Sequence, residues 1–236
     1  MGKLLLVTGT DTGVGKTIAA AWLAKTLAPR AKVALVKAVQ TGAADPLVDG
    51  DEAAYRALTG NPAIATHTLA VFPEPLAPSI AARRAGKKID PARLVKECKA
   101  IAKRHDITII EGAGGLLVPI AKGFDFADLA NALKAPLVIV IRPGLGTLNH
   151  TMLTVETAER RGLRIETLIC SGLSPKRTVV EVENLRFLRE RYPKLPLIVL
   201  HKAAPRQLAK LEFQPRYLGK VPVLLKAIPV RRTTLD

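Results

Sequence analysis

Short runs of apolar residues alternate along the chain with longer segments whose apolar positions recur at helical spacing. Runs of Val, Ile and Leu with few polar interruptions are typical of strands buried on both faces of a parallel sheet. They predict strands over Lys3–Thr8, Lys32–Lys37, Ile107–Glu111, Pro136–Ile141, Ile165–Cys170 and Leu195–Leu200. The segments between them predict helices over Lys16–Leu27, Glu52–Leu58, Pro91–Lys103, Phe126–Leu133, Leu148–Arg161 and Val179–Arg191.

Strands that alternate with helices indicate an α/β fold, in which a mostly parallel sheet is flanked by helices. No internal repeat, low-complexity segment or linker interrupts the pattern, so we expect a single domain over residues 1–236. In sheets of this kind, ligands bind beyond the carboxyl ends of the strands. Functional side chains are therefore expected at those ends.

The first strand leads into a glycine-rich loop, Gly9-Thr10-Asp11-Thr12-Gly13-Val14-Gly15-Lys16-Thr17, and then into a helix. This order is typical of a phosphate-binding loop, whose backbone N–H groups and helix N-terminus face the anion. We expect Lys16 to reach the outer phosphates of a nucleoside triphosphate and Thr17 to coordinate Mg²⁺. Five residues separate Gly9 from Gly15, one more than usual, and the alternative is a glycine-rich turn before an ordinary helix. The loop favours a phosphate-loop NTPase fold.

Charged residues stand at two further strand ends. Lys37 closes the second strand, where it is either a second cation for a transferring phosphoryl group or a solvated lysine. Glu111 closes the third strand, where it either holds Mg²⁺ opposite Thr17 or caps the tight turn Gly112–Gly115. Asp51 precedes the second helix, and by itself it is expected to be the N-cap.

A second glycine turn, Gly144-Leu145-Gly146, follows the strand that ends at Ile141 and leads into another helix. The exposed N–H groups of that helix start can bind a second anion, such as a substrate carboxylate. His150 follows in the first turn of this helix, where we expect a structural role rather than a catalytic one.

Composition narrows the class of protein. Hydrophobic residues make up 48% of the chain, but no apolar run approaches the roughly 20 residues that cross a bilayer. The chain begins directly with a strand, and Cys98 and Cys170 lack metal-ligand spacing, so we expect a cytoplasmic protein with two buried thiols. The net charge of +16 suits a nucleic-acid surface, but only 4% of residues are aromatic and the basic residues fall at spacings of solvated helix faces. We expect neither a nucleic-acid nor a membrane partner.

Four motifs together resemble the dethiobiotin synthetase family of biotin-pathway ligases. Gly9–Thr17 is similar to the family's Gly-Thr-x-Thr-x-Val-Gly-Lys-Thr, which has the same extra residue. Lys37–Gly42 is similar to Lys-Pro-Val-x-Ser/Thr-Gly, and Glu111–Gly115 is identical to Glu-Gly-Ala-Gly-Gly. Leu145–Thr154 is similar to Leu-Gly-x-x-Asn-His-x-x-Leu-Thr. The matches run in order from residue 4 to about residue 190.

The resemblance implies an ATP-dependent cyclo-ligase that acts as a homodimer, with its substrate bound near the dimer interface. In such enzymes 7,8-diaminononanoate takes up CO₂ as a carbamate, which ATP phosphorylates to a carbamic-phosphoric anhydride. The second amine then displaces phosphate and closes the cyclic urea of dethiobiotin.

The resemblance also assigns residues to these roles. It makes Lys16 and Lys37 catalytic, and Thr17, Asp51 and Glu111 ligands of Mg²⁺. It assigns nucleotide binding to Gly13, Val14, Gly15, Lys16, Thr17, Ile18, Asp51, Glu111, Ser171 and Pro222. It assigns substrate binding to Thr12, Thr41, Gly114, Gly146, Thr147, Leu148 and Asn149.

Two positions depart from the family pattern. Ala38 stands where the family usually has proline, and we expect a modest loosening there. Ser171 stands where the family often has an asparagine whose amide reads adenine, so we expect weak discrimination among nucleoside triphosphates. A late loop that packs on the base corresponds to Leu200–Ala203 by chain position or to Leu218–Pro222 by sequence, and we favour the second.

Two other classes of phosphate-loop protein compete with the ligase. A partition-type ATPase that dimerises and binds DNA fits the +16 charge, but Thr10 and Asp11 stand where such proteins usually carry an extra lysine. A cobyrinate-type amidoligase requires a glutaminase domain, for which the C-terminal half of this sequence has no room. The sequence favours the ligase and keeps the partition-type ATPase as the alternative.

Overall fold

A computed structural model describes residues 2–202 and 216–218 of the chain. Its main sheet is parallel except at one edge, where the last two strands are antiparallel. The strand order is β12 (Arg216–Leu218), β11 (Leu197–His201), β10 (Ile165–Leu173), β9 (Leu137–Ile141), β1 (Lys3–Gly9), β6 (Ile107–Gly115), β2 (Val33–Lys37) and β4 (Ala65–Thr68). Two small sheets pair β3 (Gln40–Thr41) with β5 (Val71–Phe72) and β7 (Pro119–Ala121) with β8 (Phe124–Asp125).

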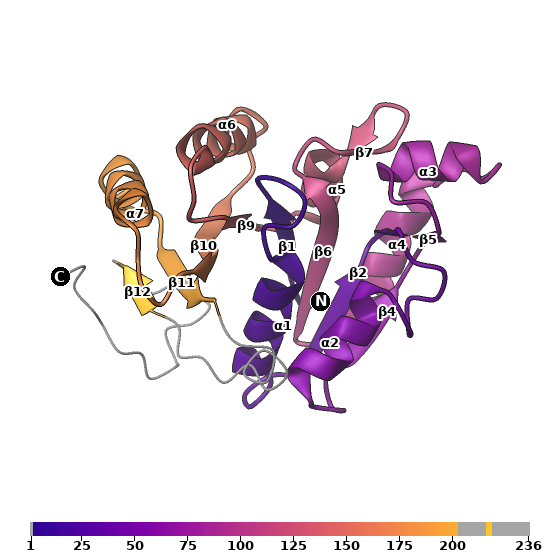
Figure 1. The fold of residues 1–236 in the computed structure, drawn as a ribbon. Helices are drawn as coiled ribbons and strands as arrows, with labels where there is room; N and C mark the ends of the chain where they lie inside the picture. Colours follow the sequence, from indigo (N-terminus) through magenta and orange to yellow (C-terminus); the bar gives the residue numbers. More distant parts are fainter. Residues whose placement is uncertain (1, 203–215, 219–236) are drawn as a thin grey trace.

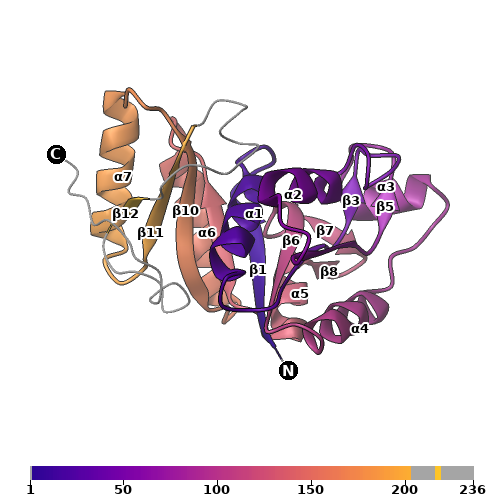
Figure 2. The same cartoon turned by 90° about the horizontal axis from the view of Figure 1, so that it is seen from below.

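Helices cover both faces of the main sheet (Figures 1 and 2). One face packs against α1 (Lys16–Leu27) and α2 (Asp51–Thr59). The other packs against α3 (Pro78–Arg84), α4 (Pro91–Ala102), α5 (Phe126–Leu133), α6 (Thr147–Arg160) and α7 (Val179–Arg191). Alternate strand residues point to opposite faces, so Leu6 joins one core and Val7 the other. Two buried faces explain why these strands are apolar at nearly every position.

The predicted mostly parallel α/β fold is confirmed, and each predicted strand and helix is present. The bounds of α1, α5 and α7 are as predicted, and the other elements have shifted ends. Four strands run past their predicted ends, and β6 and β10 do so furthest, because their last residues still pair with a neighbouring strand. In β6, Gly115 lies opposite Gly9, and in β10, Ser171 lies opposite Leu200. Several short elements were not predicted, because they are too short to show a periodic pattern: β4, the antiparallel β12, α3 and the four strands of the small sheets.

Burial of both cysteines agrees with the prediction. Burial raises the pKa of the Cys98 thiol to about 12 and also raises the pKa of Cys170. Both side chains therefore act as small apolar groups of the core. Among the helices that the structure describes, none has the length and apolar character needed to cross a membrane.

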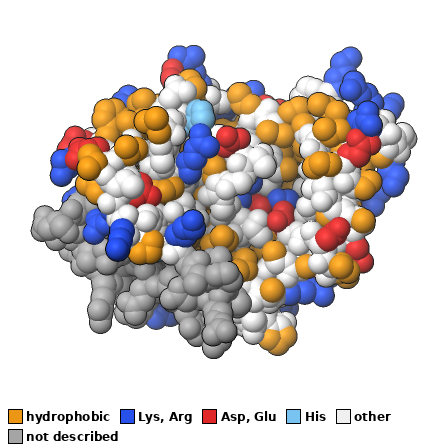
Figure 3. Space-filling view, in the orientation of Figure 1, with side chains coloured by type: hydrophobic (Ala, Val, Ile, Leu, Met, Phe, Trp, Pro, Cys, Tyr) orange, Lys and Arg blue, Asp and Glu red, His pale blue; other side chains and the backbone are white. Residues whose placement is uncertain are grey.

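Basic side chains gather over α3 and β7, at the upper right of Figure 3. They include Arg83, Arg84, Lys87, Lys88 and Lys122, which are all exposed. Arg93 and Lys96 on α4 are exposed as well. These positions agree with the expectation that this part of the positive charge lies on solvated surfaces.

Candidate active site

The phosphate loop joins β1 to α1 at the carboxyl edge of the sheet. Gly15 precedes the helix with a φ of 93°, and no side chain caps the helix start, which leaves its N–H groups directed at the position of an anion. A Cβ at Gly9 would stand 2.7 Å from the carbonyl oxygen of Asp11, so glycine is required where the loop folds back. Lys16 Nζ donates to that same carbonyl oxygen at 2.9 Å.

Lys16 is buried although it carries the charge of the loop. Burial lowers the pKa of its amine, and the positive charge of Lys37 adds to this effect, whereas Glu111, Asp51 and Asp11 oppose it. The two lysines predicted to act together are therefore close enough to influence each other.

Next to the loop, side chains from four elements form one connected cluster. Thr17 Oγ1 lies 2.9 Å from Asp51 Oδ1 and 3.1 Å from Glu111 Oε1. Lys37 Nζ forms an ion pair with Asp51 and another with Glu111 Oε1 at 2.8 Å, and it donates to the carbonyl oxygen of Gly112 at 3.1 Å. Lys37 and Glu111 meet because β2 and β6 pair with these two residues in register.

Lys37 is not the solvated strand-end lysine that was the alternative for this position. It is only 4% exposed. Burial by itself lowers the pKa of Lys37, but the charges and hydrogen bonds of Glu111 and Asp51 outweigh it, so the pKa is raised above its ordinary value. Lys37 is therefore a fixed cation inside the site.

Asp51 is not the N-cap residue that the sequence pattern predicts. Gly50 occupies the cap position without a side-chain hydrogen bond, and Asp51 is the first residue of α2. Its carboxylate turns to Thr17 and Lys37, because a charged partner attracts a carboxylate more strongly than a helix N–H group.

Two residues that the sequence analysis did not single out hold this cluster in place. Tyr55 in α2 is fully buried, and its hydroxyl donates to Glu111 Oε2 at 2.8 Å. Gln40 Oε1 accepts from the backbone N–H of Asp51 at 2.9 Å. Burial raises the pKa of Tyr55 well above its ordinary value, and the charges of Glu111 and Asp51 add to this, so the phenol stays protonated. Tyrosines in helices are often ordinary core residues, so the position of Tyr55 in the sequence does not indicate a role at the site.

The oxygen atoms of this cluster fit a magnesium ion. The carboxylates of Asp51 and Glu111 both lie within hydrogen-bonding distance of the Thr17 hydroxyl oxygen, so three oxygen donors face one position. Mg²⁺ is usually bound by one or two carboxylates together with substrate phosphates and water. In the part of the chain that the structure describes, no group of three or more His, Cys, Asp or Glu residues is suited to a metal. Phosphates and water would therefore have to supply the remaining ligands of a magnesium ion at Thr17, Asp51 and Glu111.

The α6 helix begins after β9 in the same way as α1 begins after β1. Gly146 precedes it with a φ of 86°, again with no side chain capping the helix start. Asn149 is exposed and Leu148 is half-buried, whereas Thr147 is buried with its hydroxyl 3.4 Å from that of Thr151. Thr147 can therefore offer a ligand only its backbone.

The turn before α6 is held from α7. Asn184 Nδ2 donates to the carbonyl oxygens of Pro143 at 2.9 Å and Gly144 at 3.2 Å. Because Asn184 is buried, these hydrogen bonds fix the glycine turn against the body of the protein.

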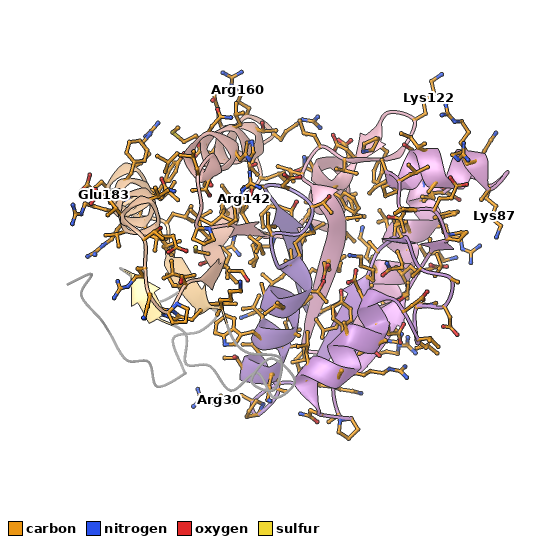
Figure 4. All side chains as sticks on the ribbon, viewed as in Figure 1. Arg30, Lys87, Lys122, Arg142, Arg160 and Glu183 are labelled. Atoms are coloured by element: carbon orange, nitrogen blue, oxygen red, sulfur yellow. The ribbon has the colours of Figure 1, made fainter. Side chains whose placement is uncertain are left out.

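Arg142 connects the two glycine loops, and the sequence analysis did not single it out. Its guanidinium lies 4.0 Å from Asp11 Oδ2 and 3.4 Å from His150 Nδ1. Figure 4 shows it between the loop after β1 and the start of α6. A Cβ at Gly146 would stand 3.6 Å from its Nη2 atom. An isolated arginine after a strand belongs to no motif, so only the fold brings it to the site.

Thr12 and Gly114, both predicted to bind substrate, lie side by side. A Cβ at Gly114, whose φ is +65°, would stand 3.5 Å from Thr12 Oγ1. Thr41 lies in β3, directly after Gln40, which contacts Asp51. Together with the start of α6, the predicted substrate residues therefore occupy four segments of the chain.

The structure describes all the residues predicted to bind nucleotide except Pro222. Val14 is buried, and Ile18 packs against the core beneath α1. Ser171 is 8% exposed, and a Cβ at Gly15 would stand 2.4 Å from its Oγ, so the hydroxyl faces the phosphate loop. Of the two candidates for the late loop, Leu200 is a core residue of β11, and Ala203 and Gly219–Pro222 lie outside the described residues. Pro222 therefore stays a prediction.

Ala38, at which we expect a modest loosening, forms a main-chain hydrogen bond that proline could not form, and the loosening stays a prediction. Ala38 is fully buried, and its N–H donates to the carbonyl oxygen of Glu111 at 3.2 Å. Proline has no N–H and could not form this bond. The bond ties the end of β2 to the end of β6, next to Lys37.

The fold and this loop together define a phosphate-loop NTPase. The solved structure of apo McdA from Cyanothece is similar, with a TM-score of 0.57 at 16% identity, over 89% of this chain and 90% of that one. A putative plasmid partition protein from Borrelia burgdorferi B31 bound to AMPPNP has a TM-score of 0.56 at 15% identity, over 90% of this chain and 91% of its own. At such low identity these likenesses show the fold alone.

Sequence relatives identify the family within this class. A family model described as an AAA domain matches residues 3–229. The ATP-dependent dethiobiotin synthetase of Mycolicibacterium gilvum is 43% identical over 77% of this chain and 80% of its own length. That of Anaeromyxobacter dehalogenans strain 2CP-C is 44% identical over 73% of this chain and 78% of its own length. The chain belongs to the ATP-dependent dethiobiotin synthetase family and is an enzyme of the ligase class.

Proposed function

We propose that this enzyme converts 7,8-diaminononanoate and CO₂ to dethiobiotin with ATP as co-substrate and Mg²⁺ as cofactor. The steps are carbamate formation, phosphorylation of the carbamate and displacement of phosphate by the second amine. We further propose that residues 1–236 act as one domain, in the cytoplasm. The names of the relatives support the overall reaction. The observation that carries the proposal is the cluster of buried Lys37 and Glu111 with half-buried Asp51 beside the phosphate loop.

The two lysines are assigned different tasks. Lys16 belongs to the phosphate loop and binds the outer phosphates of ATP. Lys37, held by Asp51 and Glu111, faces the phosphoryl group as it passes to the carbamate, where negative charge builds up. A cation fixed in advance stabilises that charge without having to reorganise.

Thr17, Asp51 and Glu111 would hold Mg²⁺, and their oxygen atoms suit its preference for hard ligands. When bound, Mg²⁺ neutralises charge on the phosphates. Tyr55 and Gln40 keep the two carboxylates oriented toward Thr17. Ser171, which faces Gly15, takes the position nearest the base and imposes little selectivity on it.

We assign the substrate carboxylate to the start of α6, at the backbone of Gly146–Asn149. Arg142 supplies a positive charge beside this helix start, since its guanidinium lies 3.4 Å from the His150 ring. Thr12, Thr41 and Gly114 line the path from there to the phosphate loop and contact the diamine.

A second copy of the chain would complete this end of the site. Gly146, Asn149 and Leu153 lie on one side of α6, because they are spaced by three and four residues. Leu153 is 56% exposed and Leu145 is 84% exposed. Figure 3 shows hydrophobic side chains on the surface over α6 and α7. Large apolar side chains next to an open helix start are typical of a covered interface, and we propose that this face forms the homodimer.

The test is ADP release measured with Mg²⁺ and ATP, with and without 7,8-diaminononanoate and bicarbonate. We expect ADP release to require both, together with formation of dethiobiotin by mass spectrometry. ATP turnover that does not change when the diamine is omitted would exclude the proposed reaction. Turnover stimulated by DNA instead would support the partition-type ATPase.

A further inference from the structure

The two carboxylate oxygens of Glu111 have different partners. Oε1 faces the proposed metal position, with Thr17 Oγ1 at 3.1 Å and Lys37 Nζ at 2.8 Å. Oε2 faces away from it and accepts the hydroxyl hydrogen of Tyr55 at 2.8 Å. Glu111 is 1% exposed and Tyr55 is 0% exposed, so solvent does not compete for either oxygen.

Tyr55 has little freedom to move. Its ring belongs to the core on the α1 and α2 face of the sheet. It follows Asp51 by four residues in α2, so the same side of the helix presents the Asp51 carboxylate and the Tyr55 phenol to the site. The N-terminus of α2 is itself held by Gln40, which accepts the N–H of Asp51. The phenol therefore fixes the rotation of the Glu111 carboxylate.

We propose that Tyr55 is a positioning residue that restricts Glu111 to one oxygen donor and thereby makes the site select Mg²⁺ over Ca²⁺. Ca²⁺ takes six to eight oxygen ligands and often binds both oxygens of a carboxylate, whereas Mg²⁺ requires an octahedral shell with single-oxygen donors. A carboxylate whose second oxygen is already occupied suits the smaller ion. This inference rests on the metal site of the proposed function.

The direct test compares Tyr55→Phe, which removes only the hydroxyl, with the unchanged protein. Binding of Mn²⁺ is followed by electron paramagnetic resonance in the presence of ADP, with ADP alone as the blank. Competition by Mg²⁺ and by Ca²⁺ then gives the ratio of their dissociation constants. We expect Tyr55→Phe to weaken Mg²⁺ binding about tenfold, the usual effect of losing a partner that orients a metal ligand, and to reduce the preference for Mg²⁺ over Ca²⁺.

Two further variants separate this effect from general destabilisation. Tyr192→Phe makes the same change at the half-buried end of α7, and we expect it to leave the ratio unchanged. Tyr55→Leu keeps the core apolar and should relax the ratio as Tyr55→Phe does. Lower thermal stability with an unchanged ratio in both Tyr55 variants would overturn the inference and leave the proposed reaction intact. Failure of the unchanged protein to bind Mn²⁺ with ADP would overturn the metal site and the inference together.

Discussion

The helices α1 and α6 begin in the same way but end up in very different surroundings. Each follows a central strand, and each is preceded by a glycine in the left-handed region, with a φ of 93° at Gly15 and 86° at Gly146. In front of α1, buried Lys16 and the cluster around Lys37 lie next to the position proposed for the phosphates of ATP. In front of α6, Leu145 is 84% exposed.

The same backbone feature, a glycine before an uncapped helix N-terminus, therefore occurs in two different surroundings. A helix N-terminus attracts any anion, but by itself it provides only a small part of the binding free energy. The chain completes the first site with its own buried charges, which suits phosphoryl transfer. At the second site it supplies Arg142, and we propose that a second copy of the chain supplies the rest.

Removal of a buried cation should damage catalysis most. We expect Lys37→Ala to lower kcat about 100-fold or more with little change in KM for ATP, because Lys37 acts mainly on the transition state. Lys16→Ala should impair both kcat and KM for ATP. Steady-state kinetics of ADP release measure these effects, with Lys96→Ala on exposed α4 as the control. Near-normal turnover of Lys37→Ala would show that its assigned role is wrong.

A charge placed on the α6 face should disrupt the proposed dimer. We expect Leu153→Asp to raise the dimer dissociation constant on the order of 10- to 100-fold, because an unpaired carboxylate would have to be buried. Analytical ultracentrifugation over a range of concentrations measures this constant. Val48→Asp, at a site that is 76% exposed in the loop before α2, is the matched control and should have no effect. If Leu153→Asp associates as the unchanged protein does, another face forms the interface.

Loss of the charge beside α6 should affect substrate binding more than chemistry. We expect Arg142→Gln to raise KM for 7,8-diaminononanoate about tenfold, as the loss of one charge-assisted hydrogen bond would do, with kcat nearly unchanged. Arg142→Lys should retain most of the affinity. Arg160→Gln, at the far end of α6, controls for the change in net charge (Figure 4). A large fall in kcat with an unchanged KM would place Arg142 in the chemical step instead.

The smallest effect is expected at the base. Ser171 can donate or accept a hydrogen bond, so it penalises a wrong base little, and the triphosphate dominates affinity. We expect CTP or GTP to support kcat/KM within about tenfold of ATP, which is about 1.4 kcal/mol. Ser171→Asn should increase the preference for ATP, whereas Ser171→Ala should not. A preference for ATP above about a hundredfold that asparagine does not change would mean that the base is read elsewhere.

Features that depend on residues close together in the chain can be predicted from the amino-acid sequence. The apolar runs predict the strands, since backbone hydrogen bonding and burial act along short segments. Glycines at fixed spacing before Lys16 predict the phosphate loop, because only its local backbone turn is needed to form it. The strand-end positions of Lys37 and Glu111 follow from the same pattern, and so does their expected proximity.

The packing of distant segments adds contacts at that edge that no local pattern of residues indicates. Tyr55 reaches Glu111 across 56 positions of the chain, and Asp51 reaches Thr17 across 34. No local pattern carries these contacts, because they depend on how α2 packs over the sheet. Arg142 likewise becomes part of the site only because β9 lies beside β1. The kinds of chemistry follow from residue types at strand ends, but the orientation of each group follows from strand register and helix packing between distant segments.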